Sequence, residues 1–412
     1  MVDTVVRDPS ERRSATGAAA GRADRALRRP EGTAACLQGS EALAFYRDHC
    51  RGALHAPPQS PDWIEAWARH CNADILCLTS AAEGRTRLAL CLEVVPGGRI
   101  RTARLVAGSH ANGNFPALCD GVATALDRTD IGALAAAVRR VRPDVDLLLM
   151  QRFARRFEGV ENPLWPARSW QSPDPALAVD LTPGFDGVLA RASGKRKRKK
   201  HRSQIRKFEA AGGFRRITAT GQDDVNRLLD AFFRMKSARF AAMGVADVFA
   251  DPGIRAFFRD LFATAAAAKA RPDFLLQALE VGGILRAVTG SSRAPRSIVC
   301  DFVAIAEDDL VTASPGDFLF FEAIREACDG GLALFDFSVG DEVYKRRWCD
   351  IETRQFDVAV PLTGVGRLAV GLRQGLVGAR RFVKSNPRLW NAVKALRRRD
   401  GARSAHAPDA ED

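Results

Sequence analysis

Residues 313–348 read ASPGDFLFFEAIREACDGGLALFDFSVGDEVYKRRW, and the rest of the chain is organised around this stretch. Ser314 precedes Pro315, which suits the first position of a helix because it has no N–H group to leave unpaired. We predict that the Ser314 hydroxyl caps this helix and that Asp317 completes a capping box. Two glycines then end the helix, and a buried apolar strand follows over Leu332–Val339.

The first turn of this predicted helix is suited to an anion. Gly316 has no side chain, so a ligand can approach the free N–H groups and the positive end of the helix dipole. A phosphate or pyrophosphate fits such a site, with Ser314, Pro315, Gly316 and Asp317 as the binding residues and Lys345 as a further phosphate contact. The alternative is an ordinary capped helix of an α/β domain, since such caps are common.

The same stretch also resembles a known family. Ser-Pro-Gly at 314–316, the helix and the pattern D-F-S-x-G-D-E-x-Y-K-x-x-W from Asp336 to Trp348 resemble the end of the CelD/BcsL-type acetyltransferase domain. This chain has Ser338 where the family pattern has glycine. The family belongs to the GNAT superfamily of acyl-CoA N-acyltransferases and is related to the FemABX aminoacyl transferases. The resemblance covers residues 181–358 well and residues 60–118 loosely.

The resemblance implies an α/β (α+β) fold of two GNAT-like units in tandem, each with a mixed, mostly antiparallel sheet flanked by helices. The predicted elements of the second unit follow the GNAT order: two helices, an antiparallel meander, the helix after Ser314 and a last strand. The strands expected to hold acyl-CoA are Ser297–Ile305 and Leu332–Val339. The predicted parts are a disordered tail (1–39), a degenerate N-terminal unit (40–157), a connector (158–175), a GNAT domain (176–360) and a basic amphipathic helix with a tail (361–412).

Acyl transfer to an amine needs a group that accepts the amine proton, donors for the oxyanion and a proton for the leaving thiolate. The candidate bases are Asp301 and Asp336, in predicted strands where burial raises a carboxyl pKa, and Asp341 in the polar turn that follows. The resemblance implies that Tyr344 protonates the thiolate. Each residue has a structural alternative: Asp336 bonding only to backbone N–H groups, Tyr344 packing as an aromatic ring, and Lys345 facing solvent.

A basic run spans Lys195–Arg202 and continues with Arg206 and Lys207. Three interpretations are open: a phosphate-binding surface for CoA or tRNA, a nonspecific nucleic-acid patch, and a solvated helix face. No aromatic residue interleaves with the run, which disfavours stacking on single-stranded nucleic acid. Like charges four residues apart repel each other on a helix, so the run favours an anion-binding role.

Composition narrows the choice of partners and compartment. The formal net charge of +13 over 412 residues favours an anionic partner, although an arginine-rich composition by itself would give the same charge. The nine cysteines are scattered without metal-ligand spacing, so we expect no metal and a reducing cytoplasm. No apolar run reaches transmembrane length and no secretory signal is apparent. We expect a cytoplasmic protein, or one peripheral to the inner membrane face.

The segment after the GNAT domain has a different character. Residues 364–396 are prone to form a helix, and Leu389, Trp390 and Val393 share one face of it beside several Lys and Arg residues. A basic amphipathic helix of this kind lies on an anionic membrane or packs on the body of the protein or on a partner. Both interpretations stay open at the level of the sequence.

Taken together, the residues and the resemblance predict an N-acyltransferase that moves an acyl group, most simply acetyl, from acyl-CoA to an amine. The resembled family is associated with extracellular polysaccharide or cellulose production, which implies an amino-sugar or nucleotide-sugar precursor as the acceptor. One alternative is a FemABX-like transferase that uses aminoacyl-tRNA, bound through Lys195–Arg202. The other is a catalytically inert scaffold that binds nucleic acid or a membrane, for which the departure at Ser338 leaves room.

Overall fold

The computed structural model describes residues 33–119, 125–165, 169–268 and 271–385. The first half contains β1 (Thr33–Gln38), α1 (Gly39–Cys50), β2 (Ala53–Leu54), α2 (Pro61–His70), β3 (Asp74–Ala82), β4 (Arg85–Gly97), β5 (Ile100–Leu105), β6 (Ala117–Cys119), α3 (Arg128–Val141), β7 (Leu147–Phe153), β8 (Arg156–Phe157) and β9 (Val160–Glu161). Short 3-10 turns cover Pro57–Gln59 and Gly108–His110.

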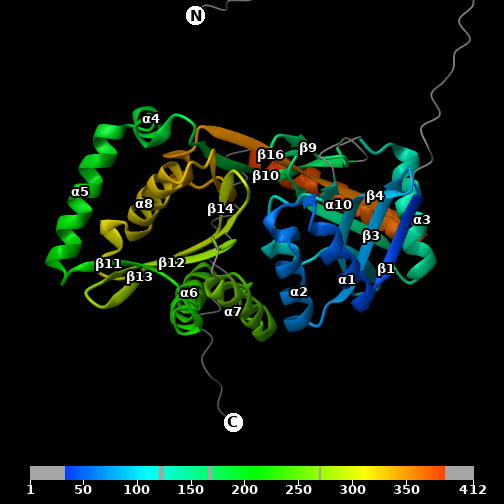
Figure 1. The fold of residues 1–412 in the computed structure, drawn as a ribbon, viewed down its shortest axis with the longest axis horizontal. Helices are drawn as coiled ribbons and strands as arrows, with labels where there is room; N and C mark the ends of the chain where they lie inside the picture. The colour runs from blue at the N-terminus through cyan, green and yellow to red at the C-terminus, as the bar shows by residue number, and fades with distance from the viewer. Residues whose placement is uncertain (1–32, 120–124, 166–168, 269–270, 386–412) are drawn as a thin grey trace, which may run out of the picture. The chain divides into compact units, whose positions relative to one another are not determined.

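The second half contains β10 (Ser169–Asp180), α4 (Gly184–Arg191), α5 (Gly194–Ala210), β11 (Phe214–Thr218), α6 (Gln222–Met243), α7 (Pro252–Ala267), β12 (Phe274–Val281), β13 (Ile284–Arg293), β14 (Ser297–Ile305), α8 (Pro315–Asp329), β15 (Leu334–Val339), α9 (Val343–Arg346), β16 (Ile351–Pro361) and α10 (Gly364–Ser385). In this half α5 and α8 lie on one face of the sheet, and α6 and α7 lie on the other (Figure 1).

One sheet joins the two halves, in the order β1-β3-β4-β5-β7-β16-β10-β15-β14-β13-β12-β11. Each half contains a parallel step across a helix, β5–α3–β7 in the first and β14–α8–β15 in the second. The two central strands pair with each other, and β16 of the second half also pairs with β7 of the first, while β10 also pairs with β15. The predicted fold class, a mixed and mostly antiparallel sheet flanked by helices, is confirmed.

Two predicted boundaries differ from the structure. Residues 33–38, assigned to the disordered tail, form the edge strand β1, which pairs with β3 from Thr33↔Ala81 to Gln38↔Leu76. The predicted connector over 158–175 overlaps β10, which begins at Ser169 and pairs with β16. Both strands pair with partners that are distant in sequence, so local patterns revealed neither β1 nor the first half of β10, although residues from Ala176 onward are predicted as a strand. The rest of the predicted tails, residues 1–32 and 386–412, lies outside the described residues.

Aromatic packing also holds the halves together. The Ser60 hydroxyl accepts the Trp63 N–H, and Pro61 occupies the first position of α2, so this helix begins where its sequence predicts. Trp63 is 1% exposed and meets Phe257 of α7 edge to face, with ring centroids 5.0 Å apart. Phe302 of β14 belongs to the same core. The first helices of the chain are therefore part of the core that supports the second half.

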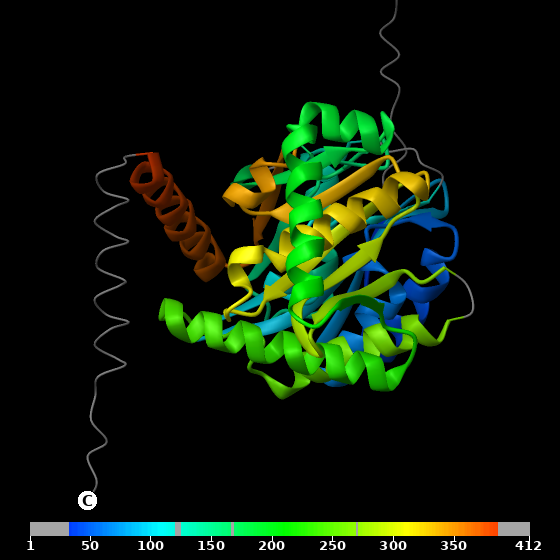
Figure 2. The same ribbon diagram turned by 90° about the vertical axis from the view of Figure 1, so that its left-hand side faces the viewer.

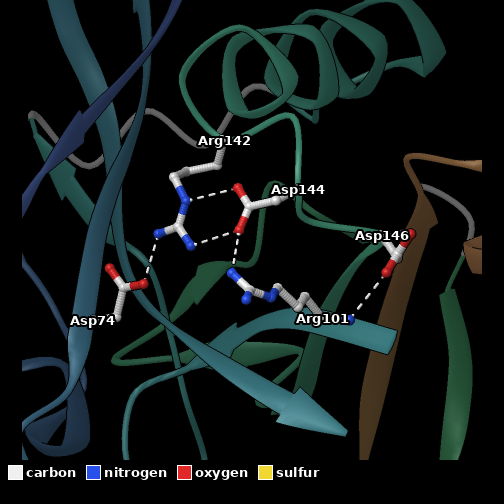
Figure 3. Close-up of polar contacts among 5 residues, drawn as sticks. All are labelled: Asp74, Arg101, Arg142, Asp144 and Asp146. Carbon is white, nitrogen blue, oxygen red and sulfur yellow. Dashed lines mark hydrogen bonds and ion pairs between the residues drawn. The ribbon is translucent and has the colours of Figure 1, made fainter. Parts of the chain in front are cut away.

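A cluster of charged side chains fixes the loop between α3 and β7 (Figure 3). The Arg142 guanidinium donates to both carboxylate oxygens of Asp144 at 2.9 Å and to Asp74 at 2.7 Å. These contacts hold the pKa of Asp144 well below its usual range, with Arg142 as the main cause. Asp146 accepts the backbone N–H of Arg101 at 3.0 Å and the Thr363 hydroxyl at 2.6 Å. The cluster therefore joins β3, β5 and β7 to the start of α10.

Candidate active site

The parallel strands β14 and β15 pair along only part of their length. Their paired positions are Ser297↔Leu334, Ile298↔Phe335 and Val299↔Asp336, although β14 continues to Ile305 and β15 to Val339. The cause lies on the other side of β14, where the register against β13 changes between Gly290↔Phe302 and Ser291↔Cys300. Asp301 is the extra residue of this bulge, and a bulge bends its strand and increases the local twist. The two strands therefore separate just beyond Asp336.

The bulge also exchanges the two faces of β14. Before it, Ile298 and Cys300 pack in the apolar cluster beneath α8. After it, Phe302 and Ala304 pack in the cluster formed with α6 and α7, and Phe302 lies 4.2 Å from Phe232 between ring centroids. Side chains alternate between the two faces of a strand. One extra residue shifts this alternation, so the even-numbered residues of β14 lie on opposite faces before and after the bulge. Asp301 lies at the point of this exchange.

Two carboxyl groups lie at this opening. The Asp301 Oδ1 accepts the Ser292 hydroxyl at 3.1 Å, while its Oδ2 is buried without a hydrogen-bond partner among the described residues. Burial raises the pKa of Asp301 to about 8, the charge of Asp336 adds to the rise, and the Ser292 hydrogen bond opposes it. Burial likewise raises the pKa of Asp336 to about 6, against the Ser338 N–H donated at 2.6 Å and the charge of Lys345.

A cavity of about 900 Å³ lies beside the opening and is lined by both halves of the sheet. Asp336, Ser338, Val299 and Ser292 line it from the second half. Asp301 does not line the cavity, but it accepts a hydrogen bond from Ser292, which does. The first half and the central strands contribute further polar side chains, among them Asn112, Arg155, Glu158 and Gln355, and Arg296 lines it at the start of β14. The cavity has the size of a small-molecule site with a few convergent polar groups.

The start of α8 is built differently from the prediction. Ser314 has φ 57° and ψ 60°, and its side chain makes no capping hydrogen bond, so the predicted capping box is wrong. The Asp317 carboxylate instead accepts the Trp348 indole N–H at 3.3 Å and pairs with Lys200 at 2.9 Å. A left-handed residue at this position cannot aim its hydroxyl as an extended N-cap residue does.

Gly316 has a packing role at the same helix start. A Cβ atom added there would lie 2.6 Å from Cδ1 of Ile305, the last residue of β14. Pro315 and Gly316 are both buried. The glycine therefore allows α8 to begin against the end of the separated strand, and a larger residue would have to push the Ile305 side chain aside. The sequence predicts that the missing side chain of Gly316 lets a ligand approach the start of the helix, and this remains a prediction.

The basic run forms most of α5 and reaches this same helix start. The Lys197 Nζ lies 3.2 Å from the centroid of the Trp348 ring, and Lys200 pairs with Asp317. The Gln204 side chain donates to the carbonyl oxygens of Ala313 and Ser314 at 2.9 and 3.0 Å. Burial lowers the pKa of Lys197 to about 8. Two features separated by more than a hundred residues, the basic run and the Ser-Pro-Gly turn, thus come together.

The outer side of α5 differs from this inner side. Exposed basic side chains recur at spacings of three and four residues and form one stripe along the helix: Lys195, Lys199, Arg202 and Arg206. His201 belongs to the inner side, where its Nε2 lies 2.7 Å from Glu322 and its ring stacks on Phe321 at 4.0 Å. The single run in the sequence therefore divides into a packed side and a solvent-facing stripe.

The remaining predicted site residues lie in and around α9. Tyr344 stacks on Phe320, with ring centroids 5.6 Å apart, and burial raises its pKa above the usual value. Lys345 is 4% exposed and donates to the Val339 carbonyl oxygen at 2.8 Å, so it braces the turn rather than facing solvent or a ligand. Asp341 is exposed, and Arg346 lowers its pKa. An exposed, strongly acidic carboxylate is a poor general base.

The sequence did not single out Lys236, a partly buried cation whose charge reaches Cys300 of β14. Lys236 of α6 lies over the rings of Phe232 and Phe240, at 6.0 and 5.6 Å from their centroids. Burial lowers its pKa, and its charge acts on the Cys300 thiol. Its position in the sequence indicates this burial. Lys236 lies four residues after Phe232 and four before Phe240, on an otherwise apolar face of the helix.

The corresponding opening in the first half is filled by the chain itself. β5 and β7 pair from Thr102↔Leu147 to Arg104↔Leu149, and Asn114 then takes the place beside β7. The Asn114 backbone bonds to Arg152 and Ala154, and its side-chain amide donates to the Gln151 carbonyl at 3.0 Å. In addition, Asp127 and Asp130 place negative charge at the start of α3. Among the described residues of this half, the strand pair is therefore not open in the way that β14 and β15 are.

Ser338 occupies a backbone conformation that favours glycine, with φ 61°. We expect Ser338→Gly to raise the free energy of unfolding by about 0.5–1 kcal/mol, since it removes left-handed strain but adds freedom to the unfolded chain. Ser338→Ala keeps the strain and serves as the matched control. Urea unfolding at neutral pH measures both variants. Equal stabilities of the glycine and alanine variants would contradict the assignment of strain to this residue.

Comparison with known proteins agrees with this geometry. Residues 195–346 match the sequence model of a family described as acetyltransferase (GNAT) domain. These residues run from the start of the basic helix to the end of α9 and include the separated strand pair. No curated protein matches the sequence.

Solved structures show similar folds at low identity. FemX is 9% identical with a TM-score of 0.52, over 79% of this chain and 97% of that protein. A domain of a putative lysylphosphatidylglycerol synthetase from Agrobacterium fabrum is 12% identical with a TM-score of 0.47, over 82% and 96%. A tandem GNAT protein from the clavulanic acid biosynthesis pathway is 13% identical with a TM-score of 0.44, over 81% and 99%. The chain described here has a GNAT-type acyltransferase fold.

Proposed function

We propose that this protein is an N-acyltransferase that moves an acyl group from acyl-CoA to an amine acceptor. The observation that carries the proposal is the separation of β14 from β15 at Asp336, beside the positive end of α8 and next to a cavity shared by both halves. A parallel pair that opens in this way offers unpaired backbone groups to an extended ligand. The cavity beside this opening offers a separate binding site for the acceptor.

The residues present fit a CoA ester. The start of α8 has a positive dipole end, and Lys197 and Lys200 add two charges beside it, which suits the phosphates. Asp317 already pairs with Lys200, so a phosphate would share that lysine with it or replace it. When bound, an acyl-CoA supplies an activated thioester carbonyl. The chain supplies the orientation of that carbonyl and the groups that move protons.

Asp336 is the residue that we assign as general base. It lines the cavity, and its pKa of about 6 leaves the carboxylate mostly ionised at neutral pH while close enough to neutrality to accept a proton. Asp301, with a pKa of about 8, stays mostly protonated and acts behind the wall by fixing the Ser292 hydroxyl. Tyr344 is the proposed proton donor to the leaving thiolate, and burial raises its pKa, so it keeps its proton at neutral pH but is a weaker acid than an exposed tyrosine.

The lining of the cavity supports an acceptor with an anionic group. Arg155, which stacks on Trp165, and Arg296 line the cavity and offer guanidinium groups to an acceptor with a phosphate or carboxylate. A nucleotide-sugar precursor carrying an amino sugar, as expected in polysaccharide or cellulose biosynthesis, combines such a group with the required amine. A screen of amino sugars, nucleotide-linked amino sugars and amino acids, followed by release of CoA thiol, would identify the acceptor.

The first experiment measures binding of CoA and acetyl-CoA by calorimetry. We expect micromolar binding to the wild type and at least tenfold weaker binding to Lys197→Gln/Lys200→Gln, because two charges beside the phosphates are lost. Lys195→Gln/Lys199→Gln removes two charges from the outer stripe of the same helix and should leave the affinity unchanged. No binding by the wild type, or equal losses in both double variants, would contradict the proposed site.

The outer stripe of α5 favours a second candidate function, a transferase that takes its acyl group from aminoacyl-tRNA. Lys195, Lys199, Arg202 and Arg206 form an exposed basic track of the kind that contacts a phosphate backbone. In a gel-shift titration with tRNA, this candidate predicts that Lys195→Gln/Lys199→Gln weakens binding and flattens its salt dependence. The inner double variant would then bind tRNA like the wild type. The two pairs of variants therefore separate the two donors.

A further inference from the structure

Helix α10 leaves an apolar stripe uncovered. Val365, Leu368 and Leu372 are 49%, 66% and 62% exposed, and their spacing of three and four residues places them on one side of the helix. The sequence continues this spacing with Leu376, Ala379 and Val383. Exposed leucines in a continuous row differ from isolated surface apolar residues, because a contiguous apolar patch marks an interaction site.

The other side of α10 fixes the helix on the sheet. Val370 packs with Leu147, Leu149 and Ala359, and the Thr363 hydroxyl bonds to Asp146 at 2.6 Å just before the helix begins. A Cβ atom at Gly366 would lie 2.0 Å from the Asp146 carbonyl oxygen, so the helix approaches the sheet as closely as glycine permits. Figure 2 shows α10 at the margin of the described structure. The stripe cannot rotate inward without losing these contacts.

The positive charge of the segment that contains the stripe indicates which kind of partner it binds. Residues 364–399 contain ten Lys or Arg residues and no Asp or Glu. Arg367, on the helix itself, is exposed. A second copy of this segment would bring two uniformly positive helices together, which like-charge repulsion opposes. An anionic lipid surface offers an apolar layer for the stripe and negative headgroups for the flanking cations.

We propose that α10 lies in the surface of an anionic lipid bilayer, with Val365, Leu368 and Leu372 in the headgroup–acyl boundary, and thereby holds the protein at a membrane. The contact is peripheral, because no helix among the described residues is long and apolar enough to span a bilayer. This inference does not depend on the proposed acyl transfer, since none of its residues lines the cavity or the strand opening.

Co-sedimentation of the full chain with vesicles tests the proposal. We expect binding to vesicles of 70% phosphatidylcholine and 30% phosphatidylglycerol, and at least tenfold weaker binding to pure phosphatidylcholine vesicles. Leu368→Gln/Leu372→Gln should weaken binding to the anionic vesicles at least tenfold, because it removes the apolar contact and keeps every charge. Raising KCl from 0.15 to 0.5 M should weaken wild-type binding as well.

The matched control removes two exposed apolar residues elsewhere. Val343→Gln/Ile284→Gln replaces side chains that are 70% and 53% exposed outside α10, and it should bind anionic vesicles like the wild type. Circular dichroism and sedimentation equilibrium accompany each variant, so that loss of folding is separated from loss of binding. Failure of the wild type to bind anionic vesicles would overturn the proposal. So would a wild-type dimer that the leucine variant converts to monomer, which would assign the stripe to a second copy.

Discussion

Asp336→Asn is expected to lower kcat at least 100-fold while the Kd for acetyl-CoA stays within about twofold of the wild type. The amide has the shape of the carboxylate and keeps an oxygen for the Ser338 N–H, which now donates to Oδ1 at 2.6 Å. It cannot accept the amine proton. The measurement is CoA-thiol release with the best acceptor from the screen, together with calorimetric binding of acetyl-CoA.

The pH dependence gives an independent check on this assignment. The pKa of about 6 predicts that wild-type kcat/KM rises with pH and levels off above pH 7, as Asp336 becomes ionised. The rising limb should disappear in Asp336→Asn. Asp301→Asn, one hydrogen bond behind the cavity wall, should lower kcat less than tenfold and keep the rising limb. If Asp301→Asn caused the larger loss, the base would be Asp301 instead.

The second large effect concerns stability. Asp301 and Asp336 have pKa values of about 8 and about 6 in the folded protein, whereas an unfolded aspartate titrates near 3.9. Between these values the folded state binds more protons than the unfolded state, so the stability that these groups give below pH 4 is lost as the pH rises towards 8. Each unit of pKa difference corresponds to about 1.4 kcal/mol, which makes the combined loss several kcal/mol.

Asp301→Asn isolates this effect. The variant cannot ionise, so its stability relative to the wild type should increase by several kcal/mol from pH 4.5 to pH 9, as measured by urea unfolding at a series of pH values. Asp341→Asn is the control, because Arg346 lowers the pKa of Asp341 in the folded protein, so its stability relative to the wild type changes only below about pH 4 and should stay constant from pH 4.5 to pH 9. A stability difference between Asp301→Asn and the wild type that does not change with pH would show that Asp301 is not perturbed as described.

The unfilled strand opening distinguishes the two halves of one sheet. Both halves use a strand–helix–strand step, but only in the second do the strands separate beside an open cavity. In the first, Asn114 occupies the equivalent place and acidic residues begin α3. We therefore expect one acyl-CoA molecule per chain, bound by the second half, with the first half contributing the far wall of the acceptor cavity.

Local sequence patterns predict several of the helices and strands and part of their chemistry. The two helices and the meander predicted for the second unit are α6, α7 and β12–β14, and each depends on residues within a few positions of one another. Ser60 caps α2, and Pro252 follows the cap Asp251 in α7, so both helix starts rest on local residues. Asp301 and Asp336 were recognised as buried strand carboxylates for the same local reason.

Contacts between residues far apart in the chain determine how these elements form the site. The bulge at Asp301 depends on the register between β13 and β14, which no local pattern encodes. The pairing of β16 with β7, the strand β1, and the contact of Lys197 with Trp348 all join residues far apart in the chain. Ser314 and Lys345 were misjudged because a left-handed backbone and a buried hydrogen bond follow from packing. Local sequence patterns thus predict individual helices and strands, whereas the residues that form the site are brought together by long-range contacts.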